Sequence, residues 1–236
     1  AGGDARADPG GAGAVNAAGT ARLLGELGRR RSLGEVDPVV VVVSTAEVYG
    51  AGHTRPIVET EPAAPRSPYA ASKRGAELAA QETRERTGLR VVIARAFPHT
   101  GPGQDERFVA PAFARRLRGA RLARARIVKV GNLEPTRDFL DVRDVAAAYV
   151  RLMGCGAAGE VYNVASGVGV TLRELFDQLA AIVGVDAIPE PDPEFMRPAD
   201  IPYLVGDAGK LRAATAWAPT YVLDQTLRDL VNAQAD

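Results

Sequence analysis

A run of five valines at residues 39–43 most constrains what this 236-residue chain can fold into. A short, continuous run of β-branched residues is typical of a strand buried on both faces, as in a parallel sheet. Ser44 and Thr45 follow at the carboxyl end of this strand. Short apolar runs alternate with helical patterns along the rest of the chain, which predicts an α/β fold with a doubly wound parallel sheet.

A helix is expected after this strand, with two reactive side chains on one face. Ser67 is a suitable N-cap, and Pro68 suits the first helical position. Tyr69 and Lys73 are four residues apart, so they share a face of the helix. A free tyrosine titrates near ~10, and a neighbouring ammonium lowers that pKa by favouring the phenolate. With Thr45 holding a substrate oxygen, this group is expected to exchange a proton with an alcohol or carbonyl.

The helical and strand patterns divide the chain into three parts. Residues 1–14 are rich in Gly, Ala and Asp without an apolar period, and are expected to be loop or disordered. Residues 15–125 are expected to form a partial Rossmann-like domain, and residues 126–236 mainly a small substrate-binding part with some segments returning to that domain. Helices are expected over residues 15–30, 69–87, 108–118, 142–153, 172–183, 210–214 and 223–233, and strands over residues 39–44, 89–94, 127–130, 161–164 and 187–191.

Composition and charge argue against several classes of function. Lys and Arg balance Asp and Glu at 29 each, so the net charge is zero and no nucleic-acid partner is indicated. His53, His99 and the single Cys155 form no metal-ligand pattern, so no metal is expected. One cysteine excludes an internal disulfide and suits a reducing cytoplasm. No apolar run approaches the ~18 residues of a membrane span, so no membrane partner is expected.

Several motifs are spread along the chain from about Asn16 onward. They are residues 43–50 (VSTAEVYG), 67–73 (SPYAASK), 95–104 (RAFPHTGPGQ), 130–144 (VGNLEPTRDFLDVRD), 159–167 (GEVYNVASG), 197–200 (RPAD) and 206–207 (GD). Together they resemble the extended short-chain dehydrogenase/reductases that act on nucleotide sugars. Residues 130–144 are most similar to GDP-4-keto-6-deoxymannose reductases, with GDP-mannose 4,6-dehydratases as near relatives.

The resemblance implies roles for four residues in catalysis. Tyr69 would be the acid/base, Lys73 would tune its pKa, and Thr45 would hold the substrate oxygen. Glu47 matches the position of a base in the dehydratases. Ala46 stands where that group has an acidic or hydroxyl residue, so a solvated carboxylate is an equal alternative for Glu47.

The resemblance also implies residues that bind the cofactor and a GDP-sugar substrate. The residues implied for the cofactor, NADP or NAD, are Tyr69, Lys73, Phe97 and His99. The residues implied for the substrate are Asn132, Arg137 and Arg197. A guanidinium fork matches the oxygens of a diphosphate, whereas the alternative for Arg137 is a surface ion pair with Asp138 or Asp141. Pro98 stands where the family usually has an asparagine that contacts substrate.

The glycine-rich turn that binds a dinucleotide pyrophosphate is absent from this sequence. Such a site needs a strand, a Gly-x-x-Gly-x-x-Gly turn and a helix N-terminus. Gly10, Gly11 and Gly13 follow no apolar strand. The resemblance aligns Asn16 with the segment that enters the family's fourth helix. The sheet is therefore expected to lack its first βαβ units, by truncation or a mis-called gene start, and this chain is expected not to bind NADPH tightly.

Three functions follow from the resemblance. The first is NADPH-dependent reduction of GDP-4-keto-6-deoxymannose in the full-length form. The second is a GDP-mannose 4,6-dehydratase, in which Glu47 removes the C5 proton. The third is a non-catalytic nucleotide-sugar-binding remnant, which the absent glycine turn supports. Family members commonly dimerise through two helices per chain, so the helices from Val15 and Tyr69 are expected to form a homodimer interface.

Overall fold

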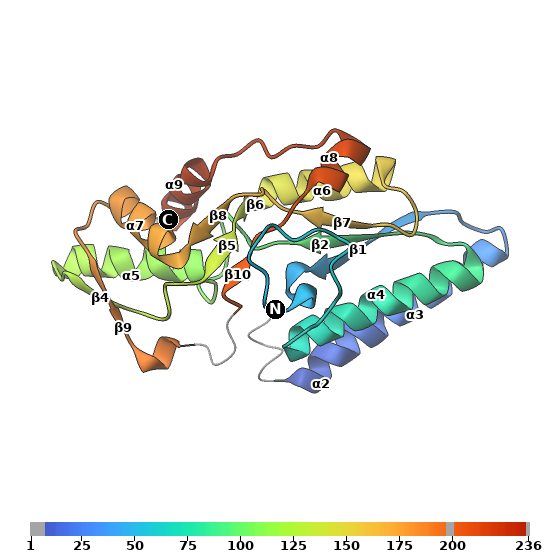
Figure 1. The fold of residues 1–236 in the computed structure, drawn as a ribbon, viewed down its shortest axis with the longest axis horizontal. Coiled ribbons are helices and arrows are strands. Elements are labelled where there is room, and N and C mark those ends of the chain that lie inside the picture. Colours follow the sequence, from blue (N-terminus) through green and yellow to red (C-terminus); the bar gives the residue numbers. More distant parts are fainter. Residues whose placement is uncertain (1–7, 197–200, 235–236) are drawn as a thin grey trace.

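The computed structural model describes residues 8–196 and 201–234. A three-stranded parallel sheet with helices on both faces forms one part of the molecule (Figure 1). The strand order is β1 (Val39–Thr45), β2 (Arg90–Ala96), β7 (Val161–Val164). Helices α3 (Thr20–Ser32) and α4 (Pro68–Thr87) cover one face. Helices α6 (Val142–Cys155) and α8 (Gly209–Thr215) cover the other. The predicted doubly wound α/β arrangement is confirmed.

Alternate side chains of β2 fill separate cores on the two faces of the sheet. Val91 and Ile93 pack in the cluster under α3 and α4, which includes Leu24. Val92 and Ala94 pack in the cluster on the opposite face. This separation follows from the two-residue period of a strand, and burial on both faces explains the continuous apolar sequence of β2.

Strand β1 forms an edge of this sheet among the described residues, because it pairs only with β2. Val39, Val40 and Val41 are half-buried, and Val43 is 41% exposed. The prediction that the whole valine run is fully buried is therefore wrong. An edge strand has a neighbour on one side only, so part of its surface stays open to solvent.

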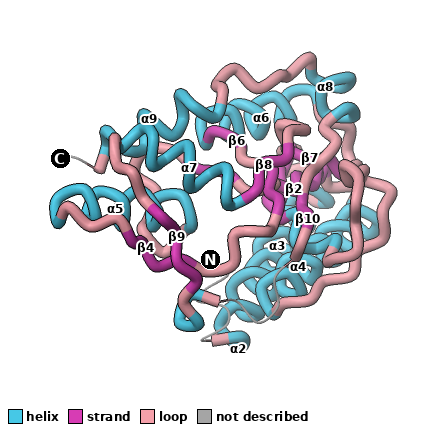
Figure 2. Tube along the Cα trace, turned by 60° about the vertical axis from the view of Figure 1, so that its left-hand side comes forward, coloured by secondary structure: helices cyan, strands magenta, loops and turns pink. Residues whose placement is uncertain are grey.

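A second core lies at the other end of the molecule (Figure 2). Its rings Phe113 and Phe176 meet edge to face, with centroids 5.4 Å apart. The elements around it are α5 (Val109–Ala123), β4 (Ile127–Val130), α7 (Leu172–Val183), β9 (Ile188–Pro191) and α9 (Leu223–Ala233). Helix α5 packs here although it precedes residue 126, and the predicted three-part division stays a prediction.

Short strands form two small sheets between these cores. One sheet has the order β10-β5-β8, and the other pairs β3 with β6. Their bounds are β3 (His99–Thr100), β5 (Thr136–Asp138), β6 (Leu140–Asp141), β8 (Gly169–Thr171) and β10 (Tyr203–Leu204). No helix of the described residues is long and apolar enough to cross a membrane.

The first described segment is helical, so the loop expected up to residue 14 is wrong from Pro9 onward. Helix α2 (Pro9–Ala12) continues into a π-helical stretch, η1 (Gly13–Gly19), and then into α3. The side chain of Asp8 accepts a hydrogen bond from Gly11 N at 2.8 Å. An Asp N-cap followed by proline is a helix-start signal, and it outweighs the low helix propensity of the glycines here.

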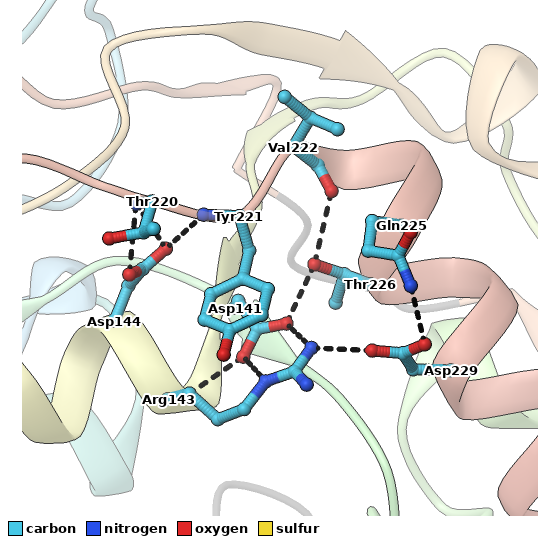
Figure 3. A network of polar contacts seen from close by, with 9 residues as sticks. All are labelled: Asp141, Arg143, Asp144, Thr220, Tyr221, Val222, Gln225, Thr226 and Asp229. Atoms are coloured by element: carbon cyan, nitrogen blue, oxygen red, sulfur yellow. Dashed lines mark hydrogen bonds and ion pairs between the residues drawn. The ribbon is translucent and has the colours of Figure 1, made fainter.

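A polar network fixes α9 against the first turn of α6 (Figure 3). Asp141 caps α6 and pairs with Arg143, which also pairs with Asp229 on α9. Asp144 accepts hydrogen bonds from the backbone N–H groups of Thr220 and Tyr221. This network holds α9 and the segment before it against α6.

Candidate active site

The side chains predicted to react come together where β1 ends and α4 begins. Ser67 caps α4 as predicted, because its Oγ accepts a hydrogen bond from Ala70 N at 3.1 Å, and Pro68 occupies the first helical position. Tyr69 lies close enough to Thr45, the last residue of β1, for the Thr45 side chain to lower the Tyr69 pKa. The structure therefore places a phenol and a hydroxyl near each other at the carboxyl end of a parallel strand, where ligands bind in such sheets.

The pKa of Tyr69 is raised above its ordinary value, contrary to the sequence-based prediction. Burial is the main cause, because it disfavours the charged phenolate, and the negative charge of Glu47 adds to it. The nearby Thr45 side chain acts in the opposite direction. Tyr69 is therefore protonated at neutral pH in this structure, as an acid must be.

Lys73 lies beside Tyr69 without setting its pKa. Its Nζ donates a hydrogen bond to the backbone oxygen of Val43 at 3.1 Å and lies 6.0 Å from the centre of the Tyr69 ring. Burial lowers the pKa of Lys73. The expected lowering of the Tyr69 pKa by this ammonium is wrong here, because burial and Glu47 dominate.

Glu47 belongs to the same cluster. Its Oε2 accepts a hydrogen bond from Ser67 Oγ at 3.3 Å, and its backbone N–H donates to Thr45 Oγ1 at 3.3 Å. Ser67 thus caps α4 and also holds the carboxylate near Tyr69. This arrangement provides a carboxylate and a phenol within one site, which suits either proton donation or proton removal.

The residues proposed for the cofactor beyond this cluster lie after β2. Phe97 is 1% exposed and packs in the cluster on the face of the sheet that α6 and α8 cover. Its ring centre lies 6.4 Å from that of Tyr49. His99 is half-buried in β3, and its Nδ1 is 3.0 Å from the Phe97 oxygen. The backbone oxygen of Pro98 accepts a hydrogen bond from Leu140 N at 3.0 Å. The cofactor roles of Phe97 and His99 stay predictions, and a contact from Phe97 would come from its backbone.

The residues proposed for the substrate lie in the second part of the chain. Asn132 is exposed, and its Oδ1 accepts a hydrogen bond from Glu134 N at 3.1 Å. Arg137 lies on β5, and its Nη1 donates to Thr136 O at 2.9 Å. Asp138 accepts hydrogen bonds from the backbone of Ser166 and Gly167. Arg197 lies outside the described residues.

The described residues fit one end of a nicotinamide dinucleotide. Tyr69 and Lys73 offer a phenol and an ammonium for the nicotinamide end. For the pyrophosphate, Gly10 and Gly11 lie inside α2, whose N-terminus is already capped by the Asp8 carboxylate. That anionic cap repels a phosphate, so these glycines do not form a phosphate cradle.

Sequence reasoning missed a buried charge cluster behind the site. Glu77 is 0% exposed and pairs with Arg95, which is 4% exposed. Glu77 extends the four-residue spacing that begins with Tyr69 and Lys73, and this spacing was the available signal. Its partner on β2 cannot be identified from spacing alone.

Comparison with known proteins gives consistent matches along nearly the whole chain. A family model described as GDP-mannose 4,6 dehydratase matches residues 4–230. The GDP-6-deoxy-D-mannose reductase of Pseudomonas aeruginosa is 38% identical over 221 residues, which cover 92% of this chain and 71% of that protein. The GDP-mannose 4,6-dehydratase of Vibrio cholerae is 28% identical over 250 residues, covering 92% of this chain and 65% of that protein.

Many solved structures share this fold. The structure of RMD from Pseudomonas aeruginosa complexed with NADPH superposes with a TM-score of 0.90 and 36% identity, covering 99% of this chain and 77% of that one. The structure of DesIV, a dTDP-glucose 4,6-dehydratase from Streptomyces venezuelae with NAD and TYD bound, has a TM-score of 0.85 and 26% identity. That match covers 100% of this chain and 70% of DesIV.

Proposed function

The chain belongs to the GDP-mannose 4,6-dehydratase family, and from this premise we propose that its site reduces the 4-keto group of GDP-4-keto-6-deoxymannose with NADPH. The observation that carries the proposal is Tyr69, which is half-buried, has a raised pKa and lies near Thr45 and Glu47 at the carboxyl end of β1. The similarity to a protein named GDP-6-deoxy-D-mannose reductase supports this choice of substrate.

The residues of the chain act on the oxygen of the keto group in this proposal. NADPH, when bound, supplies the hydride that adds to C4. Thr45 donates a hydrogen bond that holds the carbonyl oxygen, and Tyr69 gives that oxygen its proton as negative charge develops on it. The product is the C4 alcohol, and Tyr69 recovers its proton from solvent.

Lys73 has a binding role in this proposal. Burial lowers its pKa, but its Nζ already donates to the oxygen of Val43, the residue two before Thr45. An ammonium held at the strand end can donate its other hydrogens to ribose hydroxyls of a dinucleotide. The proposed contacts to the diphosphate of the GDP-sugar come from Arg137 and Arg197, with Asn132 nearby in sequence.

Dehydration of GDP-mannose is the second candidate, because Glu47 is held beside Tyr69. Ser67 Oγ fixes this carboxylate at 3.3 Å, and a carboxylate there could remove the C5 proton. Dehydratases are also among the relatives, as in Vibrio cholerae. The higher identity to the Pseudomonas aeruginosa reductase, 38% against 28% for the Vibrio cholerae dehydratase, favours reduction.

A homodimer is also proposed. The pair α3 and α4 leaves Leu23 60% exposed and Leu78 51% exposed, and two such helices from each chain could bury these side chains together. Light scattering at micromolar concentration tests this, and a strictly monomeric mass would contradict it. A cytoplasmic location stays a prediction from the single cysteine.

Analysis of products separates the two reactions. The chain is fused behind the part of the Pseudomonas aeruginosa reductase that precedes the matched region, because that protein binds NADPH. The fused enzyme is given NADPH with GDP-4-keto-6-deoxymannose, and NADP with GDP-mannose. We expect GDP-4-keto-6-deoxymannose to gain two hydrogens and GDP-mannose to remain unchanged. Loss of water from GDP-mannose would instead support the dehydratase, and binding of both sugars without change would support the non-catalytic alternative.

A further inference from the structure

A buried ion pair joins the three elements around the proposed site. Arg95 on β2 donates from Nε and Nη2 to the two carboxylate oxygens of Glu77 on α4, at 2.9 Å each. Ser44 on β1 donates from Oγ to Glu77 Oε1 at 2.6 Å. All three side chains are buried. One carboxylate thus connects α4 to both neighbouring strands.

The ion pair lies on the face of α4 that carries the proposed acid. Tyr69, Lys73 and Glu77 follow one another at intervals of four residues, on successive turns. Ser44 directly precedes Thr45 on β1. Glu77 lies about 12 Å from Tyr69 along the helix axis, since eight residues rise ~1.5 Å each, so the carboxylate acts on the phenol only through the helix.

The same cluster reaches the third strand of the sheet. The Arg95 guanidinium lies 4.6 Å from the centre of the Tyr49 ring. Tyr49 Oη donates to Asn163 Oδ1 on β7 at 2.7 Å, and Asn163 Nδ2 donates to Ile57 O at 2.8 Å. The position of α4 is therefore linked by polar contacts to β1, β2 and β7.

Stability alone is a poor explanation for this pair. Taking two charges out of water is costly, and buried ion pairs can often be replaced by apolar side chains without loss of stability. Within the described part of the chain, Arg95 Nη1 is also buried with no hydrogen-bond partner, which adds to the cost. The pair instead fixes how α4 is rotated about its axis and where it lies on the sheet.

We propose that Glu77 and Arg95 are positioning residues, which hold α4 in the one register on β1 that brings Tyr69 to Thr45. Ser44 completes the link to β1. The inference rests on the proposed function for the role of Tyr69. Loss of the pair should therefore change the environment of the Tyr69 phenol. This change can be measured in the 236-residue chain without turnover.

Titration of Tyr69 by NMR, with tyrosine labelled at Cζ, tests the proposal. The Tyr69 signal is assigned by its loss in Tyr69→Phe. The double variant Glu77→Leu/Arg95→Met removes the pair without changing the net charge. Glu77 also pairs with Arg74 on α4, at 2.8 Å. The double variant and its parent therefore both carry Arg74→Met, so that any difference at Tyr69 reports position. Ser44→Ala removes only the link to β1. The matched control Glu82→Leu/Arg86→Met removes an exposed pair, 2.9 Å apart, from the same helix.

We expect the double variant to unfold cooperatively at a denaturant midpoint no lower than that of the parent, with the Tyr69 titration shifted to lower pH. The shift follows because a loosened α4 admits water to the phenol and weakens the effect of burial. Ser44→Ala should shift it in the same direction, and the control should not shift it.

An unchanged Tyr69 titration in the folded double variant would overturn the proposal. Loss of cooperative unfolding in that variant would overturn it too, because the pair would then be needed for stability. Absence of reductase activity in the fused enzyme contradicts the proposed function alone and leaves this result intact.

Discussion

At the scale of single residues, the protonation of Tyr69 follows from its surroundings. Burial and the charge of Glu47 both raise its pKa, while Lys73 is bonded to the Val43 oxygen. Spacing on a helix predicted that Tyr69 and Lys73 share a face, but it could not predict which neighbour dominates. That balance depends on burial and on Glu47, which reaches the phenol from a different segment.

Glu47→Gln should lower the pKa of Tyr69, because it removes a negative charge that disfavours the phenolate. The lower pKa should also change how the turnover of the fused enzyme depends on pH. A proton donor is lost as pH rises through its pKa, so the variant should lose turnover at a lower pH than the parent. Tyrosine NMR titration measures the first effect, with Glu82→Gln on the exposed face of α4 as the control. An unchanged or higher Tyr69 pKa would contradict this electrostatic account.

Arg137→Ala should weaken binding of a GDP-sugar by about 1.5–3 kcal/mol, the range for hydrogen bonds to a charged group. This loss corresponds to roughly 10- to 150-fold in Kd. Calorimetry with GDP-mannose measures it, and Arg126→Ala is the control, since Arg126 pairs with Asp186 on the surface. Equal affinity of Arg137→Ala and the parent would mean that Arg137 does not bind the GDP-sugar.

At the scale of elements, Ser67→Ala should lower the free energy of unfolding by about 1 kcal/mol, the usual cost of a lost N-cap. Thr171→Ala, which removes the cap of α7, should cost a similar amount. Only Ser67→Ala should also change the Tyr69 titration, since Ser67 bonds to Glu47. Denaturant unfolding and NMR check both effects. Equal Tyr69 titrations in the two variants would mean that Ser67 caps α4 without affecting Tyr69, and would contradict this prediction.

The elements with strong local signals were predicted from the sequence almost to the residue. Helix α7 combines an apolar period with the Thr171–Glu174 capping box, and β7 coincides with the strand predicted over residues 161–164. The short strands β3 and β6 were missed, because two residues carry no period and their pairing joins segments about 40 residues apart. The Glu77–Arg95 pair was missed for the same reason, since a polar residue is buried only by its distant partner.

At the scale of the whole molecule, the described residues include the Thr45, Tyr69 and Lys73 cluster but no strand, glycine turn and helix N-terminus that could cradle a pyrophosphate. Pyrophosphate affinity in this architecture comes mainly from backbone N–H groups at a helix N-terminus after a glycine turn. We therefore expect no saturable NADPH binding by the 236-residue chain below millimolar concentration. Fluorescence titration measures this. A Kd near ~1 μM, about −8 kcal/mol, would mean that another segment binds the phosphates.

Turnover of GDP-4-keto-6-deoxymannose by the fused enzyme, with Tyr69 intact and with Tyr69→Phe, tests the central claim most directly. Phenylalanine keeps the ring and its packing but removes the proton that the keto oxygen must receive. The account predicts NADPH-dependent formation of the GDP-6-deoxyhexose by the parent, no detectable turnover by Tyr69→Phe, and similar calorimetric affinity of both for the GDP-sugar. Near-parental turnover by Tyr69→Phe would contradict it.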